Sequence, residues 1–169
     1  RDLVISVFLA WALGMVCASL VYAADVTAIL PPGAKPSGPF SPGILAGEFL
    51  YVAGQGGQTP DGKLPEGKEE QIRQCLRNVE TVVKTAGLTM DHVVYVQVYL
   101  IDYSDEDLLN RVWKEFFPKA PPARSTIGVA GLHGTTVEMS AVAVKDLSLK
   151  KPIVPAGYPS TMPISPAVR

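Results

Sequence analysis

An arginine and a glutamate in the last third of the chain are residue types that together could handle an acidic substrate. Arg124 follows directly after "PPA" and precedes the run "STIGVAG". Pro122 fixes its own φ and biases Pro121 toward extended geometry, so Arg124 enters the next strand from a rigid approach. A guanidinium held in this way suits bidentate capture of a carboxylate, where hydrogen bonds to charged groups contribute about 1.5–3 kcal/mol. The alternative is an ordinary solvated arginine at a strand edge.

Glu138 is the second candidate and lies in "TVEMSAVAV". It alternates with Val137 and Met139 and therefore shares a strand face with Ser140. A carboxylate on a half-apolar strand face is either an exposed polar residue or a proton carrier. We expect the two closing strands to be antiparallel neighbours, which would bring Arg124 and Glu138 to the same edge of the sheet.

The elements that must position these residues follow from hydrophobic periodicity and turn signals. Strands are predicted at 44–45 and 49–53 around a turn at 46–47, then at 92–102, 125–130 and 136–144. Helices are predicted over 69–86 and from Ser104 onward. The order ββ-α-β-α-ββ predicts an α+β fold with both helices on one face of the sheet.

Each predicted helix carries an apolar stripe. The first is expected to end at the capping Gly87, and the second to begin at Ser104 with Asp107 in a capping-box position. The stripes comprise Ile72, Cys75, Leu76, Val79, Val82, Val83 and Ala86 in the first helix, and Leu108, Leu109, Val112, Trp113, Phe116 and Phe117 in the second. The strand at 92–102 is apolar on both faces. Its face away from the helices, with Val96 or its neighbours, is expected to pack against partner subunits.

Composition limits the classes of function. The chain has 169 residues, 47% hydrophobic residues and a net charge of -1, which suits one globular domain of roughly 100–200 residues. No block of basic residues indicates a nucleic-acid partner. Beyond Cys17, Cys75 is the only cysteine, and the two histidines could not build a usual zinc site without carboxylates from unrelated positions. We therefore predict no metal and no cofactor. Cys75 is interpreted as a buried, inert thiol.

The first 22 residues include a long uncharged apolar run from Leu3 to Tyr22, followed by "VYAAD". Val21 and Ala23 fit the small-residue pattern of a signal-peptidase site. We therefore interpret 1–23 as a signal peptide of an exported protein, periplasmic or secreted, with no membrane association after cleavage. An uncleaved membrane anchor is the alternative, because the run is about 20 residues long. Residues 24–36 form a proline-punctuated lead-in, and 37–148 form the domain.

The proline-rich tail, 149–169, partly repeats an earlier segment. "GYPSTMPISPAVR" resembles "AKPSGPFSPGIL", with Pro-Ser in both and "PISPAV" matching "PFSPGI" with one extra residue before it. A repeat that restarts in this way indicates the first copy of a tandem pair. The alternative is chance similarity between proline-biased segments.

Four segments resemble the signature sequences of the YjgF/Rid family of reactive-intermediate imine/enamine deaminases, also labelled endoribonuclease L-PSP. These segments are "GPFSPGILAGEFLYVAGQ", "NRVWKEFF", "PPARST" and "VEMSAVAV". Their order and spacing agree from Gly38 to Leu147. The resemblance implies a chorismate-mutase-like fold, assembled as a homotrimer with clefts between subunits, and a small carboxylate as substrate. It also implies metal-free hydrolysis of aminoacrylate-type enamine and imine acids to a 2-keto acid and ammonia.

The same resemblance implies roles for particular residues. Arg124 would hold the substrate carboxylate, and Glu138 would position or activate water. Gly54 would contact the substrate through its backbone, while Asn110 would line the site. Phe40, where the family usually has tyrosine, would pack on the substrate across the subunit boundary.

Further departures concern the lining of the pocket. Thr126 replaces a common cysteine and remains a substrate-binding candidate, and Ser140 replaces a second glutamate. "AGLHG" places His133 in a loop one residue shorter than usual. A loop histidine is more often solvated, so His133 stays outside the predicted catalytic set. These departures affect the identity of the substrate more than the type of reaction.

Two other functions remain open at this point. A non-catalytic module that binds small carboxylates would need Arg124 but not Glu138. A protein-binding role would need an exposed apolar patch outside the subunit contacts. Ribonuclease activity is disfavoured by the near-neutral charge.

Overall fold

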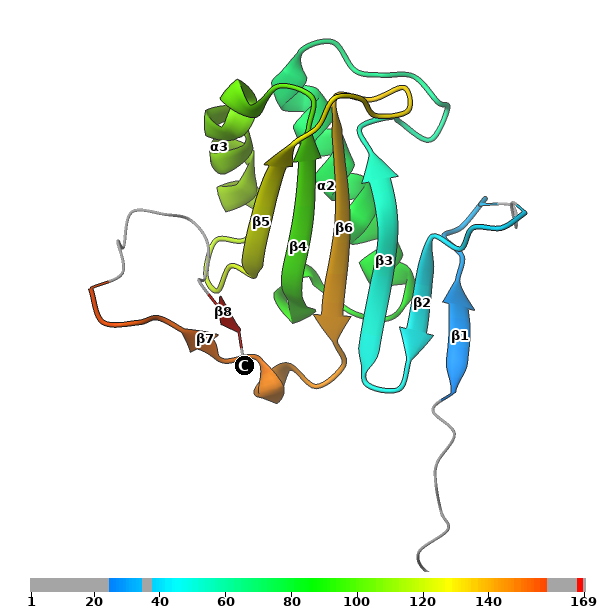
Figure 1. Ribbon diagram of the computed structural model, residues 1–169. Coiled ribbons are helices and arrows are strands. Elements are labelled where there is room, and N and C mark those ends of the chain that lie inside the picture. Colours follow the sequence, from blue (N-terminus) through cyan, green and yellow to red (C-terminus); the bar gives the residue numbers. More distant parts are fainter. Residues whose placement is uncertain (1–24, 35–37, 158–166, 169) are drawn as a thin grey trace, which may run out of the picture.

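The computed structural model describes residues 25–34, 38–157 and 167–168. Its main sheet has six strands, and both helices cover the same side of it (Figure 1). The strands are β1 (Val26–Ile29), β2 (Gly43–Ala46), β3 (Phe49–Gly56), β4 (Val93–Leu100), β5 (Ala123–Gly128) and β6 (Val137–Val144), and the helices are α2 (Lys68–Thr85) and α3 (Glu106–Phe116). Short 3-10 helices cover Met90–His92, Tyr103–Asp105 and Leu147–Leu149, and a separate hairpin contains β7 (Pro152–Ile153) and β8 (Ala167–Val168). The predicted α+β fold is confirmed.

The order of strands in the main sheet is β1-β2-β3-β6-β4-β5. Strand β5 pairs in parallel with β4, and the other neighbouring pairs are antiparallel. The expectation that the two closing strands are neighbours was therefore wrong. Two parallel strands need a crossover connection between them. Helix α3 forms this connection between β4 and β5, and β5 pairs with the outer edge of β4. The last strand, β6, then lies between β3 and β4.

The lead-in contributes more structure than its composition indicated. Strand β1 lies within the segment predicted as lead-in and pairs with β2, in the register Ala28 to Ile44 and Ile29 to Gly43. Ile29 is buried, with 8% of its surface exposed, and belongs to the core cluster together with Val82 of α2. The predicted signal peptide, 1–23, lies outside the described residues and stays a prediction. Among the described residues, no helix has the length and apolar character needed to cross a bilayer.

Helix α2 follows its predicted stripe and ends as predicted. Ile72, Cys75, Leu76, Val79, Val82 and Val83 are all buried. Gly87 has a φ of 78°, and its N–H donates to the carbonyl of Lys84 at 2.9 Å, while the N–H of Leu88 donates to Val83 at 3.1 Å. A left-handed residue at this place lets the chain turn back while satisfying the last carbonyls of the helix.

The start of α3 differs from the prediction. Ser104 does not cap the helix, and Asp107 lies within it as an ordinary exposed residue. Instead the Asp102 carboxylate accepts the backbone N–H of Ser104 at 3.0 Å and its hydroxyl at 2.6 Å. A carboxylate near the end of a strand binds N–H groups two residues onward more strongly than a serine hydroxyl does. Residues 103–105 therefore form a 3-10 turn before α3 begins at Glu106.

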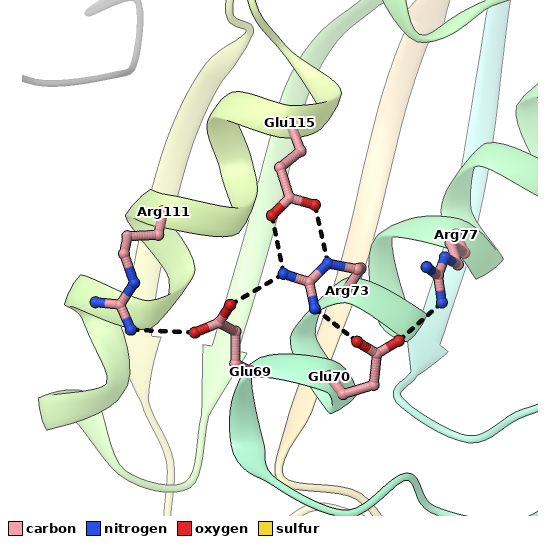
Figure 2. Close-up of polar contacts among 6 residues, drawn as sticks. All are labelled: Glu69, Glu70, Arg73, Arg77, Arg111 and Glu115. Atoms are coloured by element: carbon pink, nitrogen blue, oxygen red, sulfur yellow. Dashed lines mark hydrogen bonds and ion pairs between the residues drawn. The ribbon is translucent and has the colours of Figure 1, made fainter.

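A network of charged side chains joins the two helices (Figure 2). Arg73 of α2 is its centre and donates to Glu115 of α3 through Nε at 2.9 Å and Nη2 at 2.8 Å. Glu69, Glu70, Arg77 and Arg111 extend the network on both sides. These carboxylates, Glu115 first, raise the pKa of Arg73. Because the guanidinium is planar and has five donors, one arginine can fix the spacing between α2 and α3.

The two faces of β4 have different environments. Val96, Val98 and Leu100 are fully buried against the helices. Val96 therefore lies on the helix side, and its neighbours Tyr95 and Gln97 lie on the open face, as alternation along a strand requires. Exposed apolar side chains on the same open face include Phe49, Tyr51 and Ile127. A patch of this kind is typical of a surface that packs against another protein or another copy.

Candidate functional site

Arg124 lies at the outer strand of the sheet, on the side that α3 covers. In β5 it pairs in register with Val96 of β4. Its Nη2 donates a hydrogen bond to the side-chain oxygen Oδ1 of Asn110 at 2.7 Å. Its guanidinium carbon lies 4.9 Å from the centre of the Trp113 ring, a cation–π distance. Glu106 supplies a carboxylate oxygen 3.7 Å from Nη2. We call Arg124, Asn110 and Thr126 the arginine half-site, because Thr126 shares the strand face of Arg124.

The guanidinium is enclosed, and its hydrogen bonds are incomplete. Only 1% of the Arg124 side chain is exposed, and burial lowers its pKa, against the opposing effects of Glu106 and Tyr103. Among the described residues, Arg124 Nη1 and Trp113 Nε1 are buried without a hydrogen-bond partner. An unpaired buried donor costs about 1–3 kcal/mol. Arg124 Nη1 therefore keeps a donor for a further acceptor, and a carboxylate forms the strongest hydrogen bonds with a guanidinium.

Glu138 lies on the other face of the sheet, at one wall of a cavity of about 390 Å³. The cavity is lined by Phe40, Ser41, Pro42, Ala53, Gly54, Gln55 and Glu138. Phe40 is 75% exposed, so another group could pack against its ring. A volume of this size falls within the range of small-molecule sites, about 300–1,000 Å³. We call Phe40, Gly54 and Glu138 the glutamate half-site.

Gly54 is what lets the Glu138 carboxylate approach the backbone of β3. A Cβ at position 54 would lie 2.5 Å from Glu138 Oε1 and 2.9 Å from its carboxyl carbon. The register of β3 against β6 shifts between Val52 and Gln55, so the strand is irregular at this point. Irregular strand positions often re-aim a side chain next to a functional site. Any side chain at position 54 would have to displace the carboxylate.

Cys75 of α2 contacts this irregular segment of β3 from the helix side of the sheet. Its thiol donates to the Gln55 carbonyl oxygen at 3.0 Å, and burial, followed by the Glu138 charge, raises the pKa of the thiol. A thiol with a raised pKa is a poor nucleophile, because the thiolate is the reactive form. Cys75 is buried in the core, as predicted.

The two half-sites do not meet within one chain. Arg124 faces α3, whereas Glu138 faces the open side of the sheet, where it is level with Tyr99. The expectation that both reach the same edge was wrong, because it depended on β5 and β6 being neighbours. The structure gathers Arg124, Asn110 and Thr126 in one place. It gathers Phe40, Gly54 and Glu138 in another.

Two residues beside Arg124 were not singled out from the sequence. Glu106 and Trp113 lie four residues before and three residues after Asn110, so all three share one face of α3. That spacing was available in the sequence as a signal. Trp113 was assigned only to the core, which it also joins.

The predicted absence of a metal stays a prediction. Within the described ranges, no three His, Cys, Asp or Glu side chains are grouped so that they could hold a metal ion. His133 is exposed, and its carbonyl oxygen accepts a hydrogen bond from Gln58 at 3.4 Å.

The chain is similar to proteins of one family over most of its length. Residues 32–145 match the family model described as endoribonuclease L-PSP. A RutC family protein of Aquifex aeolicus is 37% identical over 119 residues, covering 68% of this chain and 95% of that protein. A 2-iminobutanoate/2-iminopropanoate deaminase of Bos taurus is 38% identical over 111 residues, covering 64% of this chain and 81% of that protein.

Solved structures agree with the sequence comparison. The crystal structure of a yeast protein, YEO7, superposes with a TM-score of 0.68 at 29% identity, covering 72% of this chain and all of that one. The YjgF gene product of E. coli superposes with a TM-score of 0.67 at 31% identity, covering 71% and 99%. The chain therefore belongs to the endoribonuclease L-PSP family, which includes the YjgF and RutC proteins.

Proposed function

We propose that the protein is a hydrolytic deaminase that converts reactive enamine and imine acids to 2-keto acids and ammonia. The observation that carries the proposal is the pair of half-sites, one with a buried arginine whose Nη1 has no hydrogen-bond partner and the other with a carboxylate in an open cavity. The two halves match the two ends of such a substrate, its carboxylate and its imine carbon. Relatives named as 2-iminobutanoate/2-iminopropanoate deaminases at 35–38% identity support the class of reaction.

We propose further that a complete site forms between two copies of the chain, as in a homotrimer. Two observations support this. Arg124 and Glu138 lie on opposite sides of one sheet, so a single copy cannot apply both to one small molecule. The open face also carries exposed Phe49, Tyr51 and Ile127, and the largely exposed Phe40 lines the Glu138 cavity. A head-to-tail contact that repeats around a closed ring would bring one copy's arginine half-site to its neighbour's glutamate half-site.

The chemistry uses only these side chains and water. Arg124 holds the substrate carboxylate and so aligns the imine carbon, aided by Asn110, which fixes the guanidinium. Glu138 accepts a proton as water adds to that carbon and passes it to the imine nitrogen, giving a neutral tetrahedral carbinolamine. The same carboxylate then accepts the hydroxyl proton of the carbinolamine and delivers it to nitrogen as the C–N bond breaks. Ammonia leaves and the 2-keto acid remains, so one imine and one water account for both products.

The test is release of ammonia and keto acid from imines that an amino-acid oxidase generates in situ. Wild-type protein should accelerate release over the uncatalysed rate, and Arg124→Ala and Glu138→Gln should each abolish most of the acceleration. Arg111→Ala, at an exposed arginine of α3, is the control and should retain it. No acceleration with any amino-acid-derived imine would contradict the proposal. Retained binding of a small carboxylate in that case would favour the non-catalytic module.

A further inference from the structure

The hairpin β7–β8 near the C-terminus repeats the hairpin β1–β2 that begins the main sheet. In β1–β2, Ala28 pairs with Ile44 and Ile29 with Gly43. In β7–β8, Pro152 pairs with Val168 and Ile153 with Ala167. Both members of each later pair lie 124 positions after their counterparts, since 152 and 168 follow 28 and 44 by that number. Figure 1 shows the second hairpin as a small sheet of its own.

Six residue pairs from position 29 to 42 are identical at the same offset, although Pro36-Ser37 and Pro159-Ser160 are then out of step by one position. Gly33 and Gly157 correspond, and both have left-handed backbones, with φ of 81° and 79°. The identical pairs are Ile29 and Ile153, Pro31 and Pro155, Gly33 and Gly157, Pro39 and Pro163, Ser41 and Ser165, and Pro42 and Pro166. Proline bias alone explains matching prolines, but it explains neither an identical strand register nor a matching left-handed glycine.

We propose that residues 152–168 are the first hairpin of a second domain of the same family, which follows in the natural protein. The free edge of β8 would then pair with the third strand of that domain. In the first domain, β2 uses this edge to pair with β3, with Gly43 level with Val52 and Ile44 level with Tyr51. Among the described residues, β8 pairs with β7 alone. An isolated two-stranded hairpin is only marginally stable in water, so further strands or a helix would be needed to support it.

The burial of matching side chains supports the same conclusion. Ile29 is 8% exposed because it packs into the core that α2 covers, whereas Ile153 is 45% exposed. An isoleucine at a position that is buried in the first copy indicates a helix that would cover it in the second.

One difference between the two copies restricts which side chain the second domain can have at one helix position. Gly43 corresponds to Ala167, and a Cβ at position 43 would lie 2.7 Å from Val82 Cγ1. The second domain must therefore have a smaller side chain than valine at the counterpart of Val82, or a helix displaced from the strand at that point.

The first test is the sequence of the natural full-length protein after Arg169, checked by its intact mass. We expect about 100 further residues with counterparts of β3, α2, β4, α3, β5 and β6 in that order, since one domain of this family has that length. A natural protein that ends within a few residues of Arg169, or that continues with an unrelated sequence, would overturn the proposal.

The second test measures the packing of Ile153 in the natural full-length protein by limited proteolysis. Ile153→Asp should shorten the lifetime of a resistant fragment that starts near residue 150 by roughly tenfold or more, because a buried charge is costly. Val154→Asp is the matched control, since its counterpart Leu30 is 38% exposed, and it should have little effect. Equal lifetimes for the two variants would overturn the proposal, because neither side chain would then be packed.

Discussion

The two half-sites differ in how firmly the fold holds them. The arginine half-site is enclosed, with Arg124 fixed by Asn110 and Trp113 from a helix that the Arg73 network ties to α2. The glutamate half-site is open, with Glu138 against an irregular part of β3 and beside the exposed Phe40. Rigid placement suits a group that only binds, whereas an open cavity suits a group that meets water. The difference therefore fits a division between substrate binding and proton transfer.

The largest expected effect would come from the open half-site. Glu138→Gln keeps the shape of the side chain but cannot accept a proton, and general acid–base catalysis contributes about 10²- to 10⁴-fold. We expect kcat to fall by that factor while KM changes little. Steady-state kinetics with oxidase-generated imine measures both. A rise in KM with kcat unchanged would show that Glu138 binds substrate instead.

A smaller effect should follow from moving that carboxylate without removing it. Gly54→Ala adds a methyl group 2.5 Å from Glu138 Oε1, and displacement of a catalytic group by about 1 Å can cost 10²-fold. Gly131→Ala is the matched control, because nothing lies within 4 Å of a Cβ there. Equal activity of the two variants would show that the position of Glu138 against β3 is not important.

The enclosed half-site should give an effect of about 10- to 100-fold on kcat/KM in Arg124→Ala, since hydrogen bonds to charged groups contribute about 1.5–3 kcal/mol. The loss should appear largely in KM, because the arginine binds the part of the substrate that does not react. Arg111→Ala should leave kcat/KM unchanged. If Arg124→Ala instead lowered only the melting temperature, Arg124 would be a structural residue that holds α3 to β5.

The smallest effect concerns the turn that leads into α3 and so positions Asn110. Hydrogen bonds from Ser104, followed by Lys68, lower the pKa of Asp102 from 3.8 to about 2. A carboxylate with a lowered pKa in the folded state stabilises the fold above pH 3.8, and this contribution is lost as pH falls through 2. Asp102→Asn should therefore be slightly less stable than wild type at pH 7 and equally stable near pH 2.

Denaturant unfolding at a series of pH values measures this difference. Asp107→Asn, at an exposed position in the first turn of α3, is the control and should follow the wild-type curve. A difference between Asp102→Asn and wild type that persists unchanged to pH 2 would mean that the charge of Asp102 does not stabilise the turn.

The sequence predicted local structure better than it predicted how the strands are ordered. The apolar stripes of α2 and α3 are determined by residues three and four apart, and such short-range patterns can be recognised in a single sequence. The position of β6 between β3 and β4 depends on pairing between distant segments, which periodicity does not encode. Ser104 fits the common pattern of a helix cap, but its backbone N–H and its hydroxyl both donate to the Asp102 carboxylate instead.

The same limit applies to the site. Residue types identified Arg124 and Glu138, and spacing along α3 could also have identified Glu106 and Trp113. Their placement on opposite faces could not be predicted, because it follows from the order of strands. A site completed by a second copy leaves no pattern in the sequence beyond exposed apolar residues such as Phe40.

The most direct test of a site shared between copies is complementation between two inactive variants. Arg124→Ala and Glu138→Gln would be unfolded together, mixed in equal amounts and refolded, and deaminase activity would then be measured. If each site takes its arginine from one copy and its glutamate from the next around a closed ring, about one quarter of the sites should be intact. Activity should then recover to about one quarter of that of refolded wild type. Activity no higher than that of either variant alone would contradict the account, because both residues would then have to act from the same chain.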